Sequence, residues 1–119
     1  MTFSGIDVKD AQDLLERGTV CIVDTRPPFD YAGGRIPGSI NLPGSSIRTR
    51  KGLVPAGQHV LILASDDDRA VEGCRTAQQL GFKVAGYVRG GFDAWADADY
   101  PVDTISDGMG MPGPGRGGS

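Results

Sequence analysis

The stretch HVLILASDDDRAVEGC, residues 59–74, predicts a strand, a short loop and the start of a helix. Residues 59–64 form a nearly continuous apolar run, which is typical of a central parallel strand that is covered on both faces. One of the aspartates that follow is expected to cap the helix, which is predicted to reach Leu80, where a glycine stops it. Since such loops often carry functional groups in α/β proteins, the question is why this strand ends in Ala64 before three aspartates.

The other segments alternate between helical and extended patterns. Strands are predicted at 19–24, 39–43 and 83–88, with an extended end at 100–103. Helices are predicted at 8–17, 28–34 and 90–98. Strands that alternate with helices at this spacing predict an α/β fold with a central, mostly parallel sheet of about five strands and helices on both faces.

Local signals refine these helices. Asp7 is expected to cap the first helix, and Gly18 to stop it. One face of that helix is apolar and carries Val8, Ala11, Leu14 and Leu15. Trp95, with Phe92 three residues before it, is expected to anchor the last helix in the core. A further brief turn is predicted at 45–47.

The length and composition favour one folded unit. A chain of 119 residues with 39% hydrophobic residues suffices for a single modest core but not for two. We predict one domain over residues 1–105. Residues 106–119 are rich in glycine and proline and are predicted to form a disordered tail.

The charge pattern disfavours two classes of partner. The net charge is −3, and the longest basic cluster is RTRK at 48–51, so neither nucleic acid nor an anionic membrane is expected as a partner. No apolar run approaches the roughly 20 residues that span a bilayer. The N-terminal sequence MTFSGIDVKD lacks the features of a signal peptide, so a cytoplasmic location is predicted.

The cysteines and the histidine do not suggest a metal site. Cys21 lies in an apolar strand pattern and Cys74 in a helical pattern, with neither the number nor the spacing of a disulfide framework. His59 is the sole histidine and cannot complete a zinc site with them. We expect neither a metal nor a cofactor.

Three runs of sequence together resemble the rhodanese-like (sulfurtransferase) domain family. They are VDTRPPFDYAGGRIPGSINLP, HVLILASDDDRAVEGCRTAQQLGF and VAGYVRGGFDAWADADYPV. The D-x-R after a strand, the GRIPGSINLP segment and the late GGFDAW carry the resemblance over roughly residues 4–103. It implies the rhodanese-like α/β fold.

The resemblance also implies where the active site lies. In that family the strand that corresponds to HVLILA ends in a cysteine, which accepts a sulfane sulfur as a persulfide, and an arginine follows after a short loop. The loop N–H groups and the helix N-terminus hold the negative charge. The corresponding residues here are Ala64 at the cysteine's position, then Ser65, Asp66, Asp67 and Asp68 in the loop, and Arg69 at the arginine. The nucleophile is therefore missing from its expected position.

Further residues match or depart from the family pattern. Asp24 and Arg26 match the D-x-R, and we expect structural roles, the carboxylate tying loop N–H groups and the arginine bridging neighbouring segments. Arg35 stands where the family commonly has a histidine, near the expected mouth of the site, which further disfavours catalysis.

The acidic run has two interpretations. A helix N-terminus attracts anions, and carboxylates at Asp66–Asp68 would satisfy its donors internally and repel an incoming anion. The run is either a simple helix cap with solvated neighbours, which the sequence favours, or an acidic surface that recognises a protein partner. Both interpretations argue against anion chemistry.

These observations favour a catalytically inactive rhodanese-like domain that acts as a binding or regulatory module. The alternative is a sulfurtransferase or sulfur carrier that uses a displaced cysteine such as Cys74. That residue shares a helical face with Val71, Ala77 and Gly81, which is the spacing of a core stripe, so a buried inert thiol is the stronger interpretation. Ser65 has no histidine after it to activate it, and a phosphatase of this fold lacks both nucleophile and loop length. The partner and the oligomeric state stay open.

Overall fold

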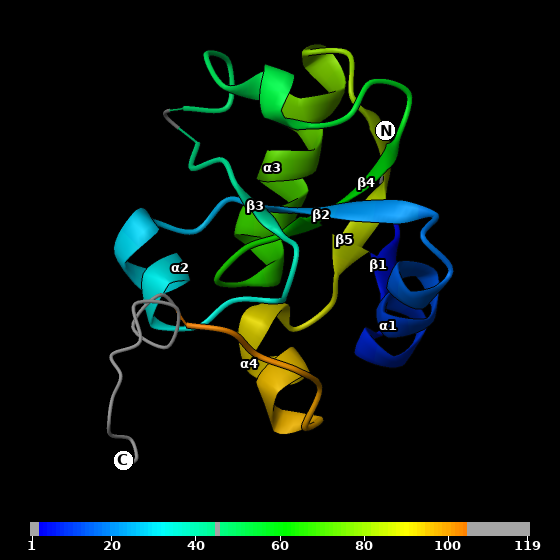
Figure 1. Cartoon of the computed structure of the whole chain (residues 1–119). Helices are drawn as coiled ribbons and strands as arrows, with labels where there is room; N and C mark the ends of the chain where they lie inside the picture. Colours follow the sequence, from blue (N-terminus) through cyan, green and yellow to red (C-terminus); the bar gives the residue numbers. More distant parts are fainter. Residues whose placement is uncertain (1–2, 45, 105–119) are drawn as a thin grey trace.

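A computed structural model describes residues 3–44 and 46–104 of the chain. Its centre is a five-stranded sheet in the order β1-β5-β4-β2-β3, in which every neighbouring pair is parallel (Figure 1). The strands are β1 (Gly5–Ile6), β2 (Val20–Asp24), β3 (Ile40–Asn41), β4 (His59–Leu63) and β5 (Lys83–Val88). The predicted α/β fold with about five strands is confirmed.

In the described part of the chain, three α-helices and a short 3-10 helix connect the strands, and a fourth α-helix follows the last strand. They are α1 (Val8–Glu16), α2 (Pro28–Gly33), the 3-10 helix η1 (Lys51–Leu53), α3 (Asp67–Gln79) and α4 (Gly91–Asp97). Ala11 of α1 and Trp95 of α4 belong to one buried apolar cluster, whereas Cys74 and Ala77 of α3 belong to another. Helices therefore cover both faces of the sheet.

Strand β4 lies in the middle of the sheet and explains the continuous apolar run of its sequence. Leu61 and Leu63 join the cluster with α1 and α4, while Val60 and Ile62 join the cluster with α3. Alternate side chains of a strand point to opposite faces, so both sets must be apolar when helices cover both faces. The carboxyl end of this strand is the rigid support for the loop that follows.

Strand β1 was not predicted. It has only two residues, too few for a periodic pattern, and it forms because β5 is available to pair with it. Asp7, expected to cap α1, stands at the N-cap position with extended backbone, but its carboxylate makes no capping hydrogen bond. It forms an ion pair with Arg89 at the end of β5 instead, a partner that local sequence does not indicate.

Other expected boundaries change in detail. The strand predicted at 39–43 is shortened to β3, and the extended end forms an isolated antiparallel bridge between Asp103 and Arg35, outside the sheet. The turn predicted at 45–47 includes a residue outside the described part, and the tail at 106–119 lies wholly outside it, so the tail and the domain boundary stay predictions. Within the described ranges, no helix is long and apolar enough to cross a membrane.

Gly86 tests the packing of β1. It has φ +150°, and a Cβ built on it would lie 2.4 Å from the carbonyl oxygen of Ser4, which precedes β1. We expect Gly86→Ala to lower the free energy of unfolding by about 1–3 kcal/mol, measured by urea denaturation, because the backbone is strained and the strands are forced apart. Gly33→Ala is the control, since a Cβ there meets open space. Equal stability of the two variants would contradict the close approach of β1 to β5.

Candidate functional site

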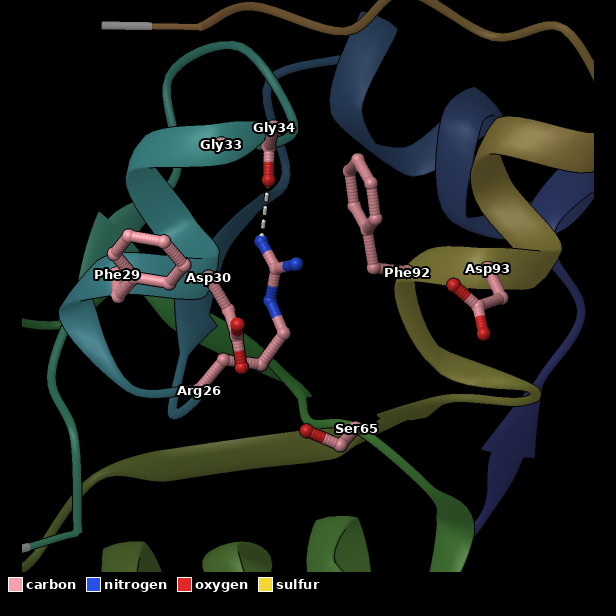
Figure 2. Close-up of a pocket in the computed structure, with 8 residues that line it drawn as sticks. All are labelled: Arg26, Phe29, Asp30, Gly33, Gly34, Ser65, Phe92 and Asp93. Atoms are coloured by element: carbon pink, nitrogen blue, oxygen red, sulfur yellow. Dashed lines mark hydrogen bonds between the residues drawn. The ribbon is translucent and has the colours of Figure 1, made fainter.

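A cleft of about 430 Å³ opens between α2, the loop after β4 and the start of α4 (Figure 2). Eight residues line it: Arg26, Phe29, Asp30, Gly33, Gly34, Ser65, Phe92 and Asp93. The parallel strands β2 and β4 both end here, because parallel neighbours place their carboxyl ends at the same edge of a sheet. Of the active-site-like loop predicted at 64–69, Ser65 lines this cleft, whereas Arg69 lines a separate pocket beside Thr25.

The loop begins at a residue without reactive chemistry. Ala64 ends the run of β4, and only 2% of its surface is exposed. Ser65, the next residue, is exposed and places its hydroxyl-bearing side chain in the wall of the cleft. No hydrogen bond of that hydroxyl is found among the described residues, so nothing there activates it as a nucleophile.

Asp66 is the cap of α3. Its backbone is extended (φ −150°, ψ 171°), and its Oδ1 accepts the Arg69 backbone N–H at 2.8 Å. The Arg69 Nε lies 3.5 Å from the other carboxylate oxygen, with both side chains mostly exposed. The expected helix cap is therefore present, and the Asp66 carboxylate satisfies a donor that an anion would otherwise use.

Asp67 makes a different contact. Its Oδ1 accepts the backbone N–H of Gly90 at 2.8 Å, which ties the loop to the turn between β5 and α4. At Gly91, the first residue of α4, φ is +65°, and a Cβ would lie 2.5 Å from the carbonyl oxygen of Ala64. A glycine is needed here both for the backbone and for the close approach. From the sequence, the GG at 90–91 indicated a helix start and part of the family motif, but not this close approach.

Asp68 is the aspartate left to solvent. It is exposed, and no hydrogen bond of its side chain is found within the described ranges. The three aspartates therefore do not act as one group, because one caps, one ties two loops together and one faces water. An acidic surface that recognises a protein partner would therefore consist mainly of Asp68 and the exposed part of Asp66.

A buried ion pair forms one wall of the cleft. The two oxygens of Asp24 accept from Arg26 Nε at 3.0 and 3.1 Å and from its Nη2 at 2.8 Å, and Oδ1 also accepts the Arg26 backbone N–H at 3.0 Å. The Arg26 Nη2 also donates to the Gly34 carbonyl at 2.7 Å, and the guanidinium carbon lies 4.3 Å from the centre of the Phe92 ring. The arginine bridges to a neighbouring segment as expected, whereas the Asp24 carboxylate binds mainly the Arg26 guanidinium and only one loop N–H group. The carboxylate compensates the charge of the guanidinium in the cleft.

Arg35 does not lie where the sequence suggested. It is not among the residues that line the cleft; its guanidinium lies 5.1 Å from the centre of the Tyr31 ring, and its backbone pairs with Asp103. One nitrogen of its guanidinium, Nη1, is buried and has no hydrogen-bond partner in the described part of the chain.

Neither cysteine lines the cleft. Cys74 is fully buried among apolar side chains, and this burial raises the pKa of its thiol to about 11. Burial also raises the pKa of the Cys21 thiol in β2. The core position predicted for Cys74 from its helical spacing is confirmed. Within the described ranges, no group of three or more histidine, cysteine, aspartate or glutamate side chains is placed to hold a metal ion.

Sequence reasoning missed most of the cleft walls. Phe29 and Asp30 come from α2, and Asp93 from α4, and none was singled out. Phe92 was expected beside Trp95 in the core; it does pack against that cluster, but it also faces the cleft. One sequence feature could have indicated the cleft. Phe29 is an aromatic residue in a short helix that has no apolar face, so its ring has no core to pack into.

The family model of the rhodanese-like domain matches residues 7–98, most of the chain. The chain belongs to the rhodanese-like domain family. A sulfurtransferase from Allochromatium vinosum is 32% identical over 92 residues, which cover 77% of this chain and 86% of that protein. The match confirms the resemblance that was based on the sequence motifs.

Solved structures agree with the rhodanese-like assignment. A rhodanese-related protein from Thermoplasma volcanium matches with a TM-score of 0.74 at 25% identity, over 85% of this chain and 98% of that one. A protein from Bacillus halodurans matches with a TM-score of 0.76 at 22% identity, over 84% of this chain and 76% of that one, and this likeness concerns the fold alone.

The cap predicts a measurable difference between two aspartates of the rhodanese-like loop. We expect Asp66→Ala to lower the free energy of unfolding by about 1 kcal/mol, because the Arg69 N–H loses its acceptor. The control Asp68→Ala should change it by less than about 0.5 kcal/mol. Urea denaturation measures both. Equal losses would show that the carboxylate of Asp66 does not stabilise α3 as a cap.

Proposed function

We propose that this chain is a catalytically inactive rhodanese-like domain that serves as a binding or regulatory module for a partner protein. The observation that carries the proposal is Ala64 directly after β4, where the family resemblance places the persulfide-forming cysteine. A methyl group has no lone pair with which to attack a sulfane sulfur. The cytoplasmic location expected from the sequence is part of the same proposal.

The charges of the cleft support this proposal. Asp30 and Asp93 bring two carboxylates to its lining, whereas the single cation there, Arg26, is compensated by Asp24. Thiosulfate and a cysteine persulfide are both anionic, so they would have to approach like charges. The cap at Asp66 further reduces the anion-binding capacity of the α3 N-terminus.

A second candidate is a sulfurtransferase or sulfur carrier that uses a displaced cysteine such as Cys74. The name of the Allochromatium vinosum relative favours it. The thiol argues against it, because at pH 7 a group with a pKa of about 11 is ionised in only about one molecule in ten thousand. The thiolate is the nucleophile in this chemistry, and Cys74 is buried away from the cleft.

The simplest test is an assay of sulfur transfer. We expect no transfer from thiosulfate to cyanide above a protein-free blank, because no ionisable thiol lines the cleft. Thiocyanate formation measures it, and Cys74→Ser and Cys21→Ser are the matched variants. Turnover that disappears in Cys74→Ser would overturn the proposal in favour of the displaced-cysteine enzyme.

A second test restores the nucleophile. Ala64→Cys alone should give little transfer, because Asp66, Asp67 and Asp68 raise the pKa of the new thiol and repel thiosulfate. The same change combined with asparagine at all three aspartates should give more.

The control for the restored variant keeps the total charge change equal. It combines Ala64→Cys with Asp10→Asn, Asp13→Asn and Asp97→Asn, three exposed aspartates that do not line the cleft. Initial rates of thiocyanate formation compare the variants. If the control is as active as the loop variant, the loop charges have no local part in silencing the site.

A further inference from the structure

The cleft has two opposed walls with the same pair of chemical features. Phe29 and Asp30 stand on the α2 wall, and Phe92 and Asp93 on the α4 wall, with Ser65 on the loop between them (Figure 2). Each wall therefore presents an aromatic ring next to a carboxylate. This combination is suited to a cation, which is attracted by the face of an aromatic ring and by a carboxylate.

Two aromatic rings of α2 and α4 already make a cation–π contact with an arginine of this chain. The Arg26 guanidinium carbon lies 4.3 Å from the centre of the Phe92 ring, and that of Arg35 lies 5.1 Å from the centre of the Tyr31 ring. Phe29 has no such contact with any cation in the described part of the chain, although 88% of its surface is exposed. Its ring is free to receive a cation from another molecule.

We propose that the cleft receives an arginine side chain from a basic segment of a partner protein. The incoming guanidinium stacks on Phe29 and bonds the carboxylate of Asp30, while the carboxylate of Asp93 on the opposite wall adds charge attraction. This inference rests on the proposed binding role and names the chemistry of the partner. The cleft volume of about 430 Å³ has room for the side chain and its flanking backbone.

Arginine suits the cleft better than the alternatives. An anion would meet two carboxylates and a guanidinium that Asp24 already compensates. A lysine ammonium is compact and strongly hydrated, whereas a guanidinium is planar, weakly hydrated and able both to stack on a ring and to bond a carboxylate. The exposed Asp68 at the neighbouring helix start adds long-range attraction for a basic segment.

The test is an NMR titration of the isotope-labelled full chain at low salt. The probe is the capped peptide Gly-Arg-Gly, compared with capped Gly-Lys-Gly and Gly-Glu-Gly. We expect the arginine peptide to shift the amide signals of Gly33, Gly34, Ser65 and Phe92. The lysine peptide should bind more weakly, and the glutamate peptide should cause no shift.

Variants locate the binding. Phe29→Leu and Asp93→Asn should each weaken the arginine peptide about two- to fivefold, because each removes one of the two attractions. Phe29→Tyr should retain binding, since it keeps the ring. The control Asp97→Asn removes an exposed carboxylate from the same helix outside the cleft and should leave the affinity unchanged.

Three outcomes would overturn the inference. They are shifts confined to residues 66–69, equal binding of the lysine or glutamate peptide, and affinity that Phe29→Leu leaves unchanged. Shifts confined to residues 66–69 would still leave a binding role at the acidic loop. If the domain is catalytically active after all, the same preparation will form thiocyanate. That result is independent of the peptide titration, so the two proposals can fail separately.

Discussion

The buried ion pair of Asp24 and Arg26 holds the walls of the cleft in place. Asp24 ends β2, and Arg26 reaches from there to the Gly34 carbonyl on one side and the Phe92 ring on the other. One guanidinium thus joins the sheet, the end of α2 and the start of α4. Removing one member of a buried pair leaves the other charge unpaired and typically costs about 3–5 kcal/mol. The shape of the cleft depends on this pair, whether or not any chemistry takes place there.

The loop after β4 shows how position gives the same residue type different roles. Asp66 meets the free N–H groups of a helix start, Asp67 meets the Gly90 N–H of a neighbouring turn, and Asp68 meets solvent. A loop that holds an anion in related proteins would need such donors free. Here the Asp66 carboxylate occupies one donor at the start of α3, while Asp67 accepts from the neighbouring turn instead. Together with Ala64, this cap supports the proposed lack of catalysis.

Much of the fold follows from local sequence. The apolar run at 59–64 indicated a strand covered on both faces, and β4 is central and buried on both. The spacing of Cys74 indicated a core position, which burial confirms. The three-aspartate run indicated a cap, and Asp66 supplies it. These features depend on residues within a few positions of one another, so periodicity and capping chemistry are sufficient to predict them.

The tertiary structure decided the features that join distant segments. The Asp7 carboxylate could accept a hydrogen bond from its own helix or pair with Arg89. It pairs with Arg89 because the pairing of β1 with β5 brings that arginine close. The Asp67 carboxylate meets Gly90 for the same reason. The cleft is assembled from α2, the β4 loop and α4, which lie far apart in the sequence. By itself the sequence determined that a buried strand ends in alanine before an acidic loop; packing determined what faces that loop, because contacts between distant segments leave no local pattern.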